Sequence, residues 1–125
     1  AGEHYGGKVK RNEEKYKKYP LYKSHTKYGF IEPLKSFVPS IGISQIIKIK
    51  EKSYVVASLG YDRPADKSLY FFDLDDENKI TNLKQIKVLE RIRDLIIHKN
   101  KLYMLFEGPP TAFNWSPSIG VTSLR

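Results

Sequence analysis

The sequence predicts an all-β protein built from antiparallel meanders. From Ile41 onward, short runs rich in β-branched and aromatic residues alternate with charged or Gly/Asn turns at roughly even spacing, which is typical of consecutive strands. No amphipathic helix of ten residues separates these runs, and this argues against the α/β enzyme classes. The chain has 125 residues, 40% of them hydrophobic, so we expect one small domain with a modest core.

Seven strands are expected in this region. The run YVVASL is nearly continuously apolar and predicts a buried strand, whereas Ile46 in the preceding run is out of phase with its apolar neighbours. That preceding run also fits helical spacing, but its β-branched residues favour a strand. Turns are expected at Lys50–Lys52, at Asp75–Lys79 and, with two residues only, at Lys99–Asn100. The expected strands are Ile43–Ile49, Tyr54–Leu59, Ser68–Leu74, Leu83–Leu89, Ile92–His98, Leu102–Phe106 and Ile119–Leu124.

Four consecutive strands followed by the start of a similar set are typical of one blade and a partial blade of a β-propeller. The same spacing is compatible with a small sandwich or an open barrel. Residues 1–40 show no sustained period and are punctuated by glycines and prolines. We therefore expect a long, irregular N-terminal connecting segment over 1–40 and blade-like strands over 41–125.

Charge and residue usage restrict the function classes. The net charge is +8, and residues 1–40 carry nine Lys/Arg against four Asp/Glu, which favours acidic partners such as nucleic acid, anionic lipid or a polyanionic cofactor. The absence of cysteine excludes disulfides and thiolate metal sites. No apolar run is long enough to span a bilayer, and no signal peptide is visible. No GxSxG, P-loop or GxGxxG motif occurs, so acyl transfer, phosphate cradling and nicotinamide binding have no motif here.

The most distinctive candidate site is the pair Arg91 and Arg93, in the run ERIRD. Two residues apart in a strand, the two side chains are expected on one face, with Asp94 on the other. Adjacent guanidiniums repel unless an anion lies between them, and their planar forks suit carboxylates. The pair therefore predicts either a clamp for the carboxylate of a ligand or cofactor, or an exposed strand face on which the arginines pair with Asp or Glu.

A second candidate is the segment Lys8–Tyr28, in which Tyr16, Tyr19, Tyr22 and Tyr28 are interleaved with Lys15, Lys17, Lys18, Lys23 and Lys27. Aromatic rings stack on bases and lysines neutralise phosphates, so this segment is compatible with binding single-stranded nucleic acid. The alternative is a solvated basic loop whose tyrosines pack on the sheet, which we favour because no arginine-rich or RNP-like pattern accompanies the segment. Nucleic acid is therefore an unfavoured partner.

Metal sites have weak support in the sequence. The acidic run Asp73–Asn78 superficially suggests a calcium loop, but it lacks the glycine and the glutamate of that motif at the positions of Asn78 and Lys84, so a solvated hairpin turn is expected. The histidines are widely separated and show no metal-ligand spacing. They are His4, His25 and His98. No metal ligand is predicted.

Four local patterns resemble the C-terminal part of the glucose/sorbosone dehydrogenase family, the soluble aldose sugar dehydrogenases that use pyrroloquinoline quinone (PQQ). They occur in the order found in the family, and the last is the most specific. The patterns are Gly2–Gly7 (GEHYGG), similar to a GxNYGWP loop; Ile31–Pro33 with Val38–Ile43 (VPSIGI), similar to an EP…WxPSIAP stretch; Tyr54–Leu59, similar to LLVGSLK; and Arg91–Asp94 (RIRD) with Leu102–Leu105 (LYML), similar to RIRDV…GxLYVLTD.

This resemblance implies a fold, a cofactor and a reaction. The family fold is a six-bladed β-propeller, of which this chain would supply about two blades, and the family reaction is the oxidation of aldose sugars at C1 with PQQ activated by calcium. Arg91 and Arg93 would be the pair that holds PQQ carboxylates. The family's catalytic base and calcium-binding region do not map onto this chain, so the catalytic residues are unknown, no metal site is assigned, and the isolated chain is expected to be inactive.

Two further readings stay open. In the first, the chain is a non-catalytic module that forms homo-oligomers through exposed blade faces and edge strands, since radial repetition is one way in which β proteins cover such surfaces. In the second, the chain is a basic anion or nucleic-acid binder. A periplasmic or secreted location is implied by the family resemblance alone.

Overall fold

The computed structural model describes residues 29, 31, 33–37, 40–60, 64–108 and 118–124. The chain divides into two units, Ala1–Leu34 and Lys35–Arg125. All strands of the described residues lie in the second unit, where they form two antiparallel sheets, and the described residues contain no α-helix. The all-β prediction is therefore confirmed.

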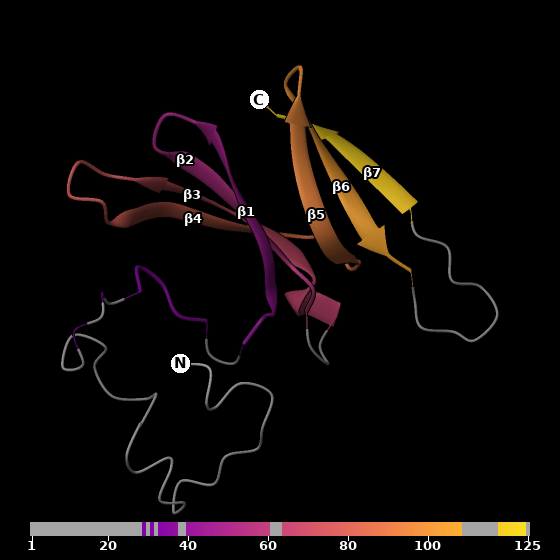
Figure 1. The fold of residues 1–125 in the computed structure, drawn as a ribbon, viewed down its shortest axis with the longest axis horizontal. Coiled ribbons are helices and arrows are strands. Elements are labelled where there is room, and N and C mark those ends of the chain that lie inside the picture. Colours follow the sequence, from indigo (N-terminus) through magenta and orange to yellow (C-terminus); the bar gives the residue numbers. More distant parts are fainter. Residues whose placement is uncertain are drawn as a thin grey trace, which may run out of the picture. The chain divides into compact units, whose positions relative to one another are not determined.

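The first sheet is a four-stranded meander in the order β1-β2-β3-β4 (Figure 1). It confirms the prediction that the first four runs form one antiparallel meander. Its strands are β1 Ile43–Lys50, β2 Ser53–Ser58, β3 Ser68–Leu74 and β4 Ile80–Lys87. The predicted fourth strand is wrong at both ends, because Ile80 and Thr81 already pair with β3 and the strand ends before Val88.

The second sheet has three strands in the order β5-β6-β7. Its strands are β5 Arg91–His98, β6 Lys101–Glu107 and β7 Ser118–Ser123. Lys99 and Asn100 both have positive φ, 47° and 59°, as a two-residue turn of type I′ requires. The predicted two-residue hairpin is thus confirmed, and so is the final strand, which pairs with β6.

A hydrophobic core lies between the two sheets. The first sheet contributes Val55, Ala57 and Leu69. Val55 and Ala57 are two residues apart on β2, and Leu69 lies directly opposite Ala57 on β3, so all three side chains point to the same face. The second sheet contributes Ile92, Leu95, Leu102 and Met104. Face-to-face packing of this kind removes the apolar side of each sheet from water and stabilises both.

The other face of the first sheet carries a second cluster, formed by Ile41, Val56, Tyr70 and Phe72. Phe37, which precedes the sheet in the chain, packs on Tyr70 with a ring-centroid separation of 5.1 Å. The first sheet is therefore covered by apolar side chains on both faces.

Buried serine hydroxyls fix the connection between β2 and β3. Ser58 and Ser68 are fully buried, and the backbone N–H of Ser68 donates to Ser58 Oγ at 3.0 Å. Ser58 Oγ in turn contacts the backbone oxygens of Asp66 and Ser68, and Ser68 Oγ donates to the Ala65 oxygen at 2.9 Å. These bonds satisfy polar groups that water cannot reach and hold the 3-10 turn Pro64–Asp66 against the sheet.

The two sheets also meet along their edges. Figure 1 shows β1 beside β5, each an edge strand of its own sheet. Ser44 Oγ on β1 donates to the backbone oxygen of Ile92 at 2.5 Å, and the Gln45 amide donates to Asp94 Oδ1 at 3.0 Å. These bonds place the start of β5, which carries the predicted arginine pair, beside β1.

Candidate functional site

The predicted arginine pair converges on one acidic side chain of the neighbouring strand. Arg91 and Arg93 lie at the start of β5, and Glu107 is the last residue of β6. Arg91 Nε lies 2.9 Å from Glu107 Oε2, and Arg93 Nη2 lies 2.8 Å from Glu107 Oε1. The two guanidiniums therefore hold one carboxylate between them, each contacting a different oxygen.

A β-bulge creates this arrangement. The register shifts between Ile92 and Asp94, so that Arg93 is the extra residue of β5 and Arg91 lies directly opposite Glu107. Ile92 and Leu95, three residues apart, are both buried, whereas Arg93 and Asp94 are both exposed. The predicted simple alternation, with Asp94 on the face opposite to the arginines, is therefore wrong at this point.

The site is partly withdrawn from solvent. The side chain of Glu107 is 13% exposed, against 35% for Arg91 and 51% for Arg93. The hydrogen bond from Arg93 is the largest cause that holds the pKa of the Glu107 carboxyl below its usual range, and the charge of Arg91 acts in the same direction against the opposing effect of desolvation. The carboxylate is therefore ionised at neutral pH.

The two arginines differ in how they engage Glu107. Arg91 Nε and Glu107 Oε2 are buried atoms, and their contact is an ion pair without the alignment of a hydrogen bond. Arg93 is the more exposed of the two and donates the hydrogen bond. An incoming anion would therefore meet Arg93 first, with Arg91 behind it.

The sequence identified the arginines but missed Glu107. The two-residue turn at Lys99–Asn100 sets the register of the hairpin, and an unbroken register would pair Glu107 with Ile92, on the other face from Arg91. The bulge shifts the pairing by one residue and brings Glu107 beside Arg91. A bulge leaves no clear signal in the run RIRD, so the partner could not be read from spacing.

The other sequence candidates are not brought to this site. His98 lies at the opposite end of β5 and is exposed. Lys8–Tyr28, His4 and His25 lie outside the described residues. No cluster of three His, Cys, Asp or Glu side chains that could hold a metal ion is present among the residues that the structure describes.

The acidic run Asp73–Asn78 forms the end of β3 and a hairpin turn, as expected. Asp75 Oδ1 accepts hydrogen bonds from the backbone N–H groups of Glu77 and Lys79, at 2.9 and 2.8 Å. Asn78 supplies the positive φ of 61° that closes the turn. Asp73 lies apart from this turn and points to Ser53 and Asn82.

The chain was compared with protein-family models, curated proteins and solved structures. No protein-family model, curated protein or solved structure matches this chain. Within the described part of the chain, no helix has the length and apolarity needed to cross a membrane.

Proposed function

We propose that this chain is part of a quinoprotein sugar dehydrogenase-like β-propeller, in which Arg91 and Arg93 hold a carboxylate of the cofactor PQQ. The single observation that carries the proposal is the convergence of both guanidiniums on one carboxylate, at 2.9 and 2.8 Å. That these two side chains hold a carboxylate of the chain itself supports their holding one of a ligand. A periplasmic or secreted location belongs to the same proposal.

The arrangement of the sheets supports a propeller. In a propeller, the outermost strand of one blade leads to the innermost strand of the next, and adjacent blades pack face to face. Here β4, an edge strand of the first sheet, leads through residues 88–90 to β5, an edge strand of the second sheet. β5 lies beside β1, at the opposite edge of the first sheet, and the two sheets share one core. In this proposal β1 and β5 are the innermost strands of two blades.

The charge of the site fits a carboxylate ligand. PQQ carries three carboxylates, and when bound it would supply the quinone that accepts hydride from a sugar. Arg91 and Arg93 bring two positive charges against the one negative charge of Glu107, so the cluster keeps a net attraction for an anion. A ligand carboxylate would contact the exposed Arg93 and compete with Glu107 for it.

The proposal assigns no catalytic base and no calcium ligand to this chain. Sugar oxidation needs a base, a metal and the quinone positioned together. We therefore expect the isolated 125-residue chain to bind the cofactor without oxidising sugars.

Equilibrium dialysis against PQQ tests the proposal. We expect binding by the wild-type chain, tighter binding by Glu107→Gln, and at least about a tenfold loss of affinity in Arg93→Ala, since a charge-assisted hydrogen bond is removed. Lys101→Ala, at the far end of the same hairpin, is the matched control for loss of one positive charge. Equal affinity in Arg93→Ala and Lys101→Ala, or no binding by any variant, would contradict the proposal.

A second candidate function, self-assembly, is favoured by the outer face of the second sheet. Two cross-strand rows of side chains cover this face: Asp94, Leu105 and Ile119 form one row, and Ile96, Tyr103 and Val121 form the other. Ile96 and Ile119 are 62% and 73% exposed. An exposed apolar sheet face of this kind is typical of surfaces that pack against another sheet, and a second copy of this chain could supply one.

A further inference from the structure

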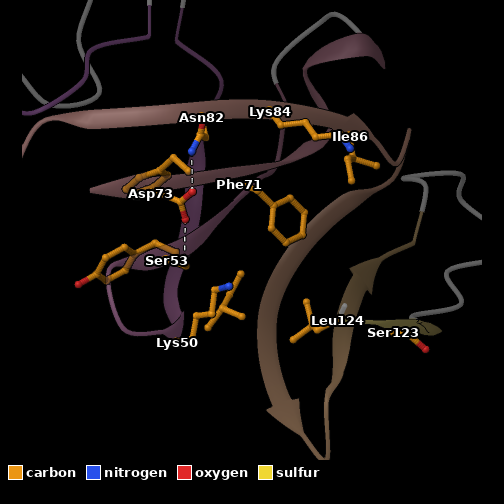
Figure 2. A pocket seen from close by; sticks show the side chains of 12 residues that line it. Lys50, Ser53, Phe71, Asp73, Asn82, Lys84, Ile86, Ser123 and Leu124 are labelled. Atoms are coloured by element: carbon orange, nitrogen blue, oxygen red, sulfur yellow. Dashed lines mark hydrogen bonds between the residues drawn. The ribbon is translucent and has the colours of Figure 1, made fainter. Parts of the chain in front are cut away.

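A cleft between the two sheets carries groups that the proposed cofactor site does not use. It has a volume of about 360 Å³ and lies between the start of β2, the end of β3 and the end of β7 (Figure 2). Its apolar floor is formed by Phe71 and Ile49 from the first sheet and by Leu124 after β7, which all pack against the main core. Pockets of this size with an apolar floor and a few placed polar groups are typical of small-molecule sites.

One end of the cleft is a fixed carboxylate. Asp73 Oδ1 accepts a hydrogen bond from Ser53 Oγ, and Asp73 Oδ2 accepts one from Asn82 Nδ2 at 3.0 Å. These bonds, with that from Ser53 the larger cause, hold the pKa of the Asp73 carboxyl below its usual range. Each oxygen keeps a further lone pair, so the ionised group can still accept donors from a ligand.

The backbone is distorted to hold this carboxylate. The register of β3 and β4 shifts between Phe71 and Asp73, and Asn82 at this bulge has a φ of 51°, which is uncommon for a residue other than glycine. The bulge directs the Asn82 amide to Asp73. Bulges and strained residues of this kind occur preferentially beside functional sites.

Two ammonium groups flank the same cleft. Lys50, at the end of β1, and Lys84, on β4, both line it, and Figure 2 shows them on opposite sides of the Phe71 ring. The positive charge of Lys50 also contributes to the lowered pKa of Asp73, so the two groups interact electrostatically. The lining of the cleft thus combines one carboxylate, two ammonium groups and an apolar wall.

We propose that this cleft binds a small zwitterion with an apolar side chain, in chemical terms a free apolar α-amino acid. The ligand's ammonium group would donate to Asp73, its carboxylate would lie against Lys84, and its side chain would pack on Phe71 and Leu124. Each ligand group then meets a complementary partner, and no charge enters the apolar floor unpaired. The inference does not depend on the arginine pair or on PQQ.

An NMR titration with L-leucine tests this proposal. We expect saturable shifts of the backbone amides of Phe71, Asn82 and Lys84. Asp73→Asn, which keeps the size of the side chain, is expected to weaken binding at least about tenfold because it removes a charge-assisted contact. Lys84→Met is also expected to weaken the binding of L-leucine. Lys87→Met, on the same strand but outside the cleft, is the matched control and should leave binding unchanged.

Ligand variants separate the two charge contacts. N-acetyl-L-leucine lacks the ammonium group and L-leucinamide lacks the carboxylate, so both should bind more weakly than L-leucine. Equal binding of all three, unchanged binding in Asp73→Asn and Lys84→Met, or no shifts at millimolar L-leucine would overturn the proposal. Binding of methyl glucoside in place of L-leucine would also overturn it, and would assign a neutral hydroxylated ligand. If Asp73→Asn does not fold, Lys84→Met and the ligand variants still decide the result.

Discussion

The guanidinium of Arg93 lies 2.8 Å from the carboxylate of Glu107, across a β-bulge that brings Arg91 to the same carboxylate. The pair that the sequence singled out for binding a carboxylate therefore binds one that belongs to the chain itself. This contact gives the site its geometry, and it also makes Glu107 a competitor for any ligand carboxylate.

Replacing Glu107 with glutamine should destabilise the fold in a pH-dependent way. The pKa of Glu107 is lowered from its ordinary value of 4.5, chiefly by the hydrogen bond from Arg93. A lowered folded-state pKa means that the stabilisation is fully present above the unfolded-state pKa and is lost as the pH falls through the folded-state value. We expect Glu107→Gln to lower the free energy of unfolding by about 1–2 kcal/mol at pH 7, and the difference from wild type to vanish in acid.

Urea denaturation at several pH values measures this effect. Glu51→Gln is the matched control, because Glu51 forms a surface ion pair with Lys48 and is 82% exposed. Such surface pairs contribute little, so this variant should unfold at nearly the same urea concentration as wild type. Equal effects of the two substitutions at pH 7 would mean that the Glu107 contact is only a surface ion pair.

The buried serine at the end of β2 offers a test of the core. Ser58→Ala removes the acceptor of the Ser68 backbone N–H and leaves that buried group unsatisfied. We expect a loss of about 1–3 kcal/mol in the free energy of unfolding. Ser118→Ala, at an exposed position of β7, should be neutral. A neutral Ser58→Ala would show that water replaces the lost hydroxyl.

Glycine is required at position 60. Gly60 has a φ of +64°, and a Cβ added there would lie 2.5 Å from Lys67 Cγ and 3.1 Å from the Lys67 backbone nitrogen. Gly60→Ala should therefore lower the free energy of unfolding by about 1–2 kcal/mol, from backbone strain and the close contact together. Asn100→Gly, in a turn that already has positive φ, should be neutral or slightly stabilising in the same thermal or urea melt. An alanine at position 60 that leaves the melt unchanged would refute this requirement.

The outer face of the second sheet should drive association if the self-assembly candidate is correct. Ile119→Lys places a charge at the most exposed end of one of the two rows and should shift a concentration-dependent oligomer toward monomer in analytical ultracentrifugation. Leu83→Lys makes the same change at an exposed site of β4 and should leave the distribution unchanged. A wild-type monomer at all concentrations would remove this candidate.

Much of the fold could be predicted because apolar alternation and turn residues act locally. Apolar residues cluster in the runs around Val55 and Leu95, as is typical of buried strands. Lys99–Asn100 closes a two-residue hairpin, as expected. Two of the errors, at the start of β4 and at the face of Asp94, fall at bulges. The residues around Asn82 are polar and show no apolar alternation, so the sequence carries no signal for the start of β4 at Ile80.

The candidate sites depend on contacts that are not local. Arg91 and Arg93 stand out by their spacing, but Glu107 joins them only because the bulge shifts the register by one residue. In the inter-sheet cleft, Asp73 meets Ser53 and Asn82 through cross-strand pairing. Leu124 reaches the same cleft only because the two sheets pack face to face. Sequence spacing within one strand carries none of this information.

Native mass spectrometry of the chain with and without PQQ tests the central claim most directly, because one spectrum reports both the cofactor adduct and the assembly state. The account predicts a discrete PQQ adduct that is lost in a variant carrying Arg91→Ala and Arg93→Ala and is kept in Lys101→Ala. The absence of an adduct in both the wild type and Glu107→Gln would contradict it, and would mean that the arginine pair only stabilises the β5–β6 hairpin.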